Sequence, residues 1–179
     1  VNGTCGIDNG ILDVDLRTLT LNDQVTRGTG GSFVSQPDGL VVYNRSSGSQ
    51  NVVLGQYGNL TLQNPSTKVM ESNIGVTSDF TVSGGSVTAG ALILFNGNRN
   101  QSVSGIPYRS IDISGSGGFT KTFTSNASIN GAMSFTGGAG VINIDNSSAA
   151  LFTVLSTADS TARIGNIGNW TINGRAVVE

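Results

Sequence analysis

The chain has 179 residues with a net charge of −2, and it contains no His. Without His, a Ser-His-Asp triad, a His-containing zinc site and a His-ligated haem are excluded. Gly, Ser, Thr and Asn together occupy 84 positions; because these residues are weak helix formers, a helix bundle or a coiled coil is disfavoured. The hydrophobic fraction of 37% is sufficient for a buried core, so the composition predicts a folded all-β protein.

Charge and hydropathy also limit the possible partners. The nine basic residues form no run, and a pI near 4.9 gives no electrostatic reason to expect nucleic acid or anionic lipid. No apolar stretch approaches the roughly 20 residues of a membrane-spanning helix. We therefore expect no nucleic-acid partner and no membrane insertion.

Short alternating segments follow one another along the chain and predict β-strands. Apolar residues alternate with Thr, Ser, Asn or a charge, and the segments are 16–21, 59–62, 79–82, 110–113, 121–124, 141–144 and 170–172. Gly-containing turn sequences lie between them. Short strands separated by turns in this way are typical of a β-sandwich, a β-barrel or a β-solenoid.

An internal repeat favours the solenoid. Residues 41–44 align with 93–96 at an offset of 52, 50–52 with 101–103 at 51, and 82–85 with 135–138 at 53. A degenerate repeat of this kind predicts a right-handed parallel β-helix, whose inward apolar residues stack from coil to coil. Tandem β-sandwich domains are the alternative.

The repeat also predicts the organisation of the chain. Residues 1–40 would be the end of a preceding repeat or an N-terminal cap, 41–92 and 93–144 repeat units, and 145–179 a truncated closing element. We expect the open ends to be covered by neighbouring repeats, by another copy of the chain or by a cap formed from residues 1–15, because bare strand edges favour association.

Aromatic residues recur in register and are expected in the core. They are Tyr43 with Phe95, and Tyr57 with Tyr108. Trp170 is the only tryptophan; it could contact a glycan or a protein partner, or cover the last coil. Cys5, the single cysteine, cannot form an intrachain disulfide. It is expected to be a small buried hydrophobe, or to pair with a partner cysteine.

The acidic residues are the candidates for a metal or catalytic site. Asp8, Asp13 and Asp15 form the only local acidic cluster and could bind calcium, although the pattern favours a solvated strand and turn. No other cofactor is expected. The remaining acids, among them Asp112 and Asp145, form no evident catalytic pair, so we expect no enzyme activity. A polysaccharide-cleaving or carbohydrate-binding β-helix remains an alternative, because fold alone does not determine chemistry.

A threonine strand suggests a second, remote alternative. Thr120, Thr122 and Thr124 would lie on one face of a strand, opposite Phe119, Lys121 and Phe123. If such a row continued across coils, it would resemble the flat surface of an ice-binding solenoid. The other strands offer only pairs, such as Thr18 with Thr20.

Residues 41–179 resemble the repetitive adhesin-like surface proteins of Bacteroidota that the type IX secretion system exports. The family phrase Phe-x-Gly-x-x-x-Gln-x-Val/Ile-x-Gly, followed by Tyr-x-Asn-Leu-Thr-Leu, is similar to segments 95–105 (FNGNRNQSVSG), 108–113 (YRSIDI) and 57–62 (YGNLTL). Segments 156–165 and 174–179 resemble the closing element of such arrays. The first repeat departs from the phrase, because Arg45 stands where the family prefers Gly.

The resemblance implies a non-catalytic, extracellular or cell-surface protein with an adhesive or spacer role. Its partners would be neighbouring repeats, other copies of the chain or surface glycans. The triplet Asp159-Ser160-Thr161 resembles the O-glycosylation site of Bacteroidota, with Ser160 as the acceptor.

Overall fold

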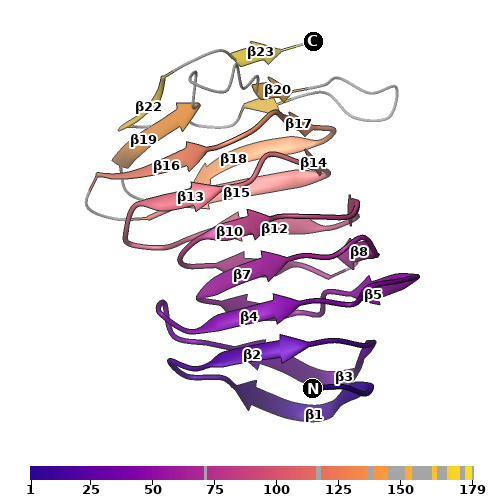
Figure 1. Cartoon of the computed structure of the whole chain (residues 1–179). Helices are drawn as coiled ribbons and strands as arrows, with labels where there is room; N and C mark the ends of the chain where they lie inside the picture. Colours follow the sequence, from indigo (N-terminus) through magenta and orange to yellow (C-terminus); the bar gives the residue numbers. More distant parts are fainter. Residues whose placement is uncertain are drawn as a thin grey trace.

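The computed structural model describes residues 1–70, 72–115, 118–136, 139–144, 152–154, 163–164, 169–173 and 176–178, and the description from residue 139 onward is mainly of the backbone. The described chain is all β and forms a right-handed parallel β-solenoid that rises from the N-terminal coil (Figure 1). This confirms the predicted fold, and the sandwich alternative is not observed. The described part contains no helix long and apolar enough to cross a bilayer.

Two eight-stranded sheets form the main walls, and all their described strand pairs are parallel. Sheet A contains β1 (Cys5–Asp13), β3 (Val25–Val34), β6 (Gly55–Tyr57), β9 (Ile74–Val76), β12 (Leu92–Phe95), β15 (Ser110–Ser114), β18 (Ala132–Thr136) and β21 (Arg163–Ile164). Sheet B contains β2 (Thr18–Leu21), β4 (Leu40–Tyr43), β7 (Asn59–Leu62), β10 (Phe80–Val82), β13 (Gln101–Val103), β16 (Phe119–Phe123), β19 (Ala139–Ile144) and β22 (Asn169–Asn173).

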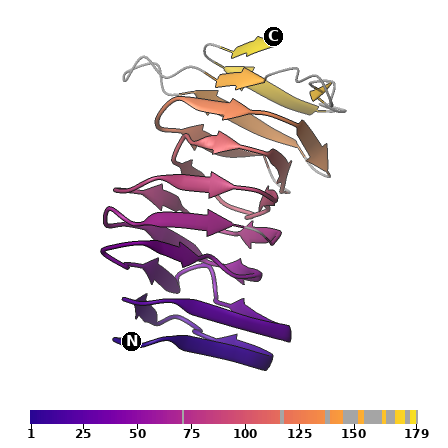
Figure 2. The same ribbon diagram turned by 90° about the vertical axis from the view of Figure 1, so that its right-hand side faces the viewer.

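A third wall begins above the first coils. Its lower part is sheet C, with β5 (Ser49–Asn51), β8 (Thr67–Met70) and β11 (Val87–Ala89). Its upper part is sheet D, with β14 (Pro107–Tyr108), β17 (Ala127–Ile129), β20 (Phe152–Val154) and β23 (Ala176–Val178). Below β5 only residues 22–24 separate β2 from β3, so the lowest coils lack this wall. Figure 2 shows them as long, flat strands at the bottom of the stack.

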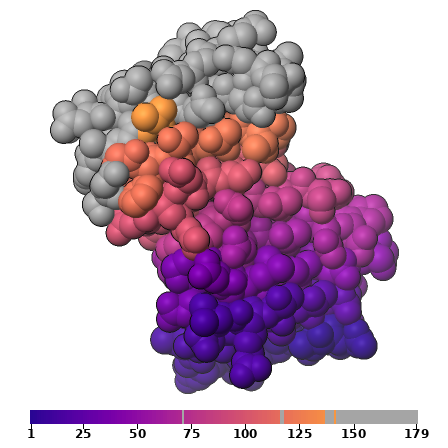
Figure 3. Space-filling view, turned by 60° about the vertical axis from the view of Figure 1, so that its left-hand side comes forward, coloured from indigo at the N-terminus to yellow at the C-terminus, as the bar shows by residue number. Residues whose placement is uncertain are grey.

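The structural period is one coil of about 20 residues. In sheet A, Gly55 pairs with Ile74 at an offset of 19, and Ile93 pairs with Ile111 at an offset of 18. The 51–53-residue offset of the sequence repeat therefore spans more than two coils. It also changes wall, because Tyr43 lies in sheet B and its counterpart Phe95 lies in sheet A. Consecutive coils follow one another as bands of colour along the body (Figure 3).

The core fills the space between the walls, because inward-facing and outward-facing residues alternate along each strand. In β7, Leu60 and Leu62 are fully buried and the residues between and beside them are half-exposed. Leu60 lies opposite Val41 below and Phe80 above, and both of these are also buried. Inward residues thus stack directly on their counterparts, and each coil covers the apolar surface of the next.

Candidate functional site

The corner after β4 holds a buried polar side chain that ties two coils together. We call residues 43–50 the first corner motif. The amide nitrogen of Gln50, which is fully buried, donates to the main-chain oxygens of Leu21 (2.9 Å) and Asp23 (2.6 Å) in the coil below. Its amide oxygen accepts a hydrogen bond from the Arg45 main-chain NH at 3.1 Å. Gln50 thereby satisfies main-chain groups of two successive coils.

The corner after β12 repeats this arrangement. We call residues 95–101 the second corner motif. Gln101 is buried, and its amide nitrogen donates to the main-chain oxygens of Val76 (3.0 Å) and Ser78 (2.5 Å) in the coil below. Its amide oxygen accepts from the Gly97 main-chain NH at 3.2 Å. The two glutamines therefore play the same structural role.

A buried lysine lies directly above the second glutamine. Lys121 pairs with Gln101 in register and is fully buried. Its ammonium donates to the main-chain oxygens of Gly97 (2.5 Å) and Arg99 (3.3 Å) and to Oε1 of Gln101. Burial lowers the pKa of Lys121 to about 8. The ammonium therefore acts as an internal cation that holds the corner loop.

The first motif has a matching lysine with fewer partners. Lys68 pairs with Gln50 and is also fully buried. Its ammonium donates to the main-chain oxygen of Arg45 at 3.2 Å and to the hydroxyl of Ser66. Burial, and then the charge of Arg45, lower the pKa of Lys68.

The predicted aromatic positions are confirmed as core. All four side chains are fully buried: Tyr43, Tyr57, Phe95 and Tyr108. The hydroxyl of Tyr57 donates to the main-chain oxygen of Val53, four residues upstream, at 2.7 Å. Tyr108 makes the equivalent bond to Ser104. Burial raises the pKa values of all three tyrosines, so they are neutral hydrogen-bonding core residues and form no exposed platform for sugars.

The outer face of sheet B carries a row of hydroxyl side chains. Thr20 lies beside Val42, Val42 beside Thr61, and Thr61 beside Thr81, in adjacent strands. Thr20 and Thr61 are half-exposed and Thr81 is exposed, whereas Val42 is buried. Val42 thus interrupts the row between Thr20 and Thr61, and Thr61 and Thr81 are the two threonines in it that lie side by side.

The predicted orientation of the threonine strand is confirmed for residues 121–124, whereas Phe119, predicted on the inward side, is half-exposed like Thr120. Lys121 and Phe123 point into the core, and Thr122 and Thr124 point outward with Thr120. Thr122 lies beside Ser102 of the neighbouring strand, so hydroxyl groups of adjacent coils meet here as well. The outer face of sheet B is therefore regular and mostly uncharged.

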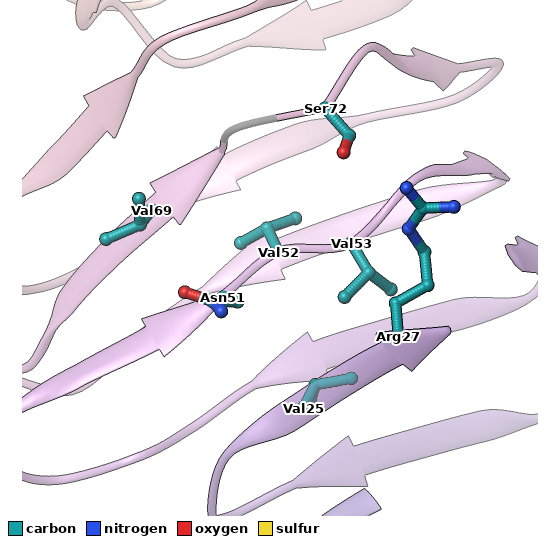
Figure 4. A pocket seen from close by; sticks show the side chains of 7 residues that line it. All are labelled: Val25, Arg27, Asn51, Val52, Val53, Val69 and Ser72. Atoms are coloured by element: carbon teal, nitrogen blue, oxygen red, sulfur yellow. The ribbon is translucent and has the colours of Figure 1, made fainter. Parts of the chain in front are cut away.

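A small cavity of about 190 Å³ lies at the step where the third wall begins (Figure 4). Its lining is formed by Val25, Arg27, Asn51, Val52, Val53, Val69 and Ser72. Arg27 rises from β3 beside Val53 (Figure 4) and donates only long hydrogen bonds, to main-chain oxygens of its own strand at 3.3 and 3.4 Å. Among the described residues it has no acidic partner. Four valines and one guanidinium could hold a small carboxylate with an aliphatic body.

The predicted calcium residues do not converge. Asp8 and Asp13 lie in β1, Asp15 lies in the following turn, and all three are exposed. The carboxylate of Asp13 accepts from the Asp15 main-chain NH at 2.8 Å, which stabilises the turn. In the part of the chain that the structure describes, no three His, Cys, Asp or Glu residues are grouped as metal ligands.

The other predicted positions are only partly visible. Trp170 lies in β22, next to Gly140 of β19, and its side chain is outside the description. Ser160 and Asp145 lie outside the described residues. Asp112 is half-buried in β15 and accepts from the Thr136 hydroxyl at 2.9 Å. Cys5 is half-buried in β1, unpaired, and packs against the core.

The interior glutamines and lysines were not predicted as functional residues. The sequence does contain a signal for these residues. Gln50 and Gln101 are 51 residues apart and Lys68 and Lys121 are 53 apart, within the range of the repeat offset. A charged residue on the apolar side of an alternating strand is the pattern that would have found them.

Comparison of the chain with protein-family models, with curated proteins and with solved structures finds no match. The fold and the corner motifs are therefore described from the geometry of this structure alone.

Proposed function

We propose that the chain is a non-catalytic repeat segment of a secreted bacterial cell-surface adhesin or fibre, of the kind that the type IX secretion system of Bacteroidota exports. In this role it acts as a rigid stalk or adhesive module, and it works by stacking coils rather than by chemistry. The resemblance of residues 41–179 to such proteins supports this proposal, together with the way in which the coils are joined.

The observation that carries the proposal is the continuous linkage along the solenoid axis. Each coil is bonded to the next by parallel strands in sheets A and B. Inside, Phe95 contacts Phe80, Tyr108 and Phe123 with ring centroids 6.1 to 6.2 Å apart. A rod in which every coil is tied to its neighbours resists bending, and this is the property that a stalk needs.

The test combines adhesion with polysaccharide cleavage. Beads coated with the chain are applied to a panel of host cells and bacterial surface glycans, and the same chain is incubated with soluble polysaccharides. We expect the beads to be retained on a surface of the panel, or to be held from the surface to which the chain is anchored at a distance that matches a rigid rod. We expect no release of reducing ends from the polysaccharides. Release of reducing ends by the chain, lost on Asp112→Asn, would overturn the proposal in favour of an enzyme.

The outer face of sheet B favours ice binding as the second candidate. Thr61 and Thr81 lie side by side in adjacent strands of this face, and adjacent strands of a β-sheet are roughly 4.8 Å apart. A thermal-hysteresis measurement on the native chain tests this candidate. Loss of hysteresis in Thr81→Lys but not in Thr88→Lys, an exposed position in sheet C, would support ice binding.

A further inference from the structure

The cavity at the start of the third wall lies within the stack of coils. Its lining begins at Val25 in β3, and β1 continues beneath this part of β3, with Ile7 paired to Arg27. Above, the described pairs between β3 and β6 are formed by Phe33 and Val34. The first half of β3 therefore lies under the corner between β5 and β6 instead of under a paired strand, and residues of both segments line the cavity (Figure 4).

Arg27 occupies an inward position of β3. It follows the fully buried Val25 by two residues, and its partner Ile7 in β1 is buried as well. Arg27 is nevertheless exposed, because no described strand pairs with this part of β3 from above. A position that would hold an apolar residue in a closed coil thus carries a cation beside the cavity.

Two further polar side chains line the cavity. Asn51 belongs to β5, and Ser72 belongs to the segment before β9. Neither side chain makes a hydrogen bond to another described residue. Figure 4 shows the Ser72 hydroxyl directed down toward the valines and the Arg27 guanidinium rising beside Val53. Hydrogen-bond donors from three separate segments therefore lie around an apolar lining of four valines.

We propose that this cavity binds a small monocarboxylate with a branched aliphatic body of about four carbons. The guanidinium of Arg27 pairs with the carboxylate, and the side chains of Asn51 and Ser72 supply further donors. The aliphatic body contacts the valines and is removed from water there. The ligand is a free acid in solution, and its binding does not depend on a role of the chain as stalk or adhesin.

The size and charge of the cavity select this class of ligand. Its volume of about 190 Å³ suits a molecule of this size, since an apolar cavity of roughly 150 Å³ holds benzene. Arg27 is the only cation among the described lining residues. A dicarboxylate or a phosphate would therefore bring a second negative charge that has no partner in the lining.

The experiment titrates the full, isotope-labelled chain with sodium isovalerate while its amide and methyl resonances are followed by NMR. We expect saturable shifts at the lining valines with a Kd on the order of 1 mM, because a ligand of this size makes few contacts. Two related compounds separate the contributions of charge and of the aliphatic body. Isovaleramide has the same shape without the charge, and acetate has the charge without the body; each is expected to bind at least about tenfold more weakly.

Variants assign the shifts to this cavity. Arg27→Gln should weaken binding by at least about tenfold, whereas Arg17→Gln, at another exposed arginine, should leave it unchanged. Val69→Phe fills the cavity and should abolish binding although the guanidinium is still present. Its matched control is Thr88→Phe, because Thr88 is exposed and pairs with Val69 but does not line the cavity.

Three results would overturn the proposal. They are the absence of saturable shifts at the lining valines up to roughly 50 mM isovalerate, equally tight binding of isovaleramide or acetate, and an unchanged affinity in Arg27→Gln. Tighter binding of N-acetylvaline than of isovalerate would also overturn it, in favour of the carboxyl end of a peptide. None of these results depends on bead retention or on the release of reducing ends, so the site and the proposed function can fail separately.

Discussion

The two corner motifs share a sequence pattern and a set of hydrogen bonds, yet they lie at different walls of the solenoid. Residues 43–50 lead from sheet B to sheet C, whereas residues 95–101 lead from sheet A to sheet B. In both, a glutamine donates to two main-chain oxygens of the coil below, and a lysine of the coil above donates to the corner loop. The motif is therefore local, because it forms at two different corners of the solenoid.

The two motifs differ in the hydrogen bonds that their lysine makes. Lys121 bonds to the side chain of Gln101 as well as to the loop, whereas Lys68 bonds to Ser66 and the loop and makes no bond to Gln50. The second motif also has Gly97 where the first has Arg45. The second corner is thus the more tightly packed and more strongly connected of the two, and the predictions below test that difference.

The largest effect is expected from Gly97→Ala. A Cβ at this position would stand 1.9 Å from the main-chain oxygen of Thr77, so the backbone of one coil must move. We expect a loss of about 3 kcal/mol in the free energy of unfolding, measured by urea denaturation. Arg45→Ala at the matching position of the first motif is the control and should cost less than about 1 kcal/mol. Equal losses at the two positions would show that the corners are packed alike.

Gln101→Leu is expected to destabilise the chain by about 2 kcal/mol, because it leaves two buried main-chain oxygens and the Lys121 ammonium short of a partner. Gln50→Leu removes the corresponding bonds to the coil below but leaves the bonds of Lys68 intact. We therefore expect Gln50→Leu to cost less, and denaturation of the two variants side by side measures the difference. A larger loss for Gln50→Leu would contradict the assigned role of the ammonium.

Much of the fold was predictable because alternation sets which side chains face the core. The strand at 59–62 is found in full as β7, and Lys121 was correctly placed on the side of Phe123. The change of wall between repeats was not predictable. It depends on loop lengths that give offsets of 18 to 23 residues between paired strands from β1 to β18, and a repeat offset alone does not show how many strands lie between its copies.

The polar interior was less predictable for a different reason. Whether a buried lysine is tolerated depends on oxygen atoms of other coils, and these are brought to Lys121 by the main chain of Gly97 and Arg99 and by the side chain of Gln101, 20 to 24 positions away. Gln24 gives a second example, because its side-chain amide bonds to Ser49 and Asn51 and takes the place of a missing strand below β5. Such contacts follow from the register of the coils and leave no periodic signal in the sequence.

The stability of the chain is expected to rise between pH 8 and about 10. The pKa of Lys121 is about 8 in the folded chain and 10.5 when unperturbed, so between these values the unfolded state binds more protons and gains stability relative to the folded state as pH falls. Above about pH 10 the effect reverses, because the buried tyrosines have raised pKa values and only the unfolded state then ionises. Urea midpoints at pH 7.5, 8.5 and 9.5 measure the rise. Lys121→Met should flatten it more than Lys68→Met does, and an unchanged slope in Lys121→Met would assign the rise to other groups.

The smallest effect is expected at the surface of the two corners. Arg99 reaches the carboxylate of Asp38 at 2.7 Å and the hydroxyl of Ser78 at 3.0 Å, whereas Arg45 lies 3.6 Å from Asp23. The Arg99 and Asp38 side chains are 44% and 73% exposed, so solvent and salt weaken the pair, and a double-mutant cycle of Arg99→Gln with Asp38→Asn should give a coupling of no more than about 0.5 kcal/mol. The same cycle on Arg45 and Asp23 should give less, because the distance is longer. If the coupling at Arg99 persists in about 1 M salt, where the Debye length is roughly 3 Å, the 2.7 Å hydrogen bond between Arg99 and Asp38 contributes more to it than the long-range attraction of their charges.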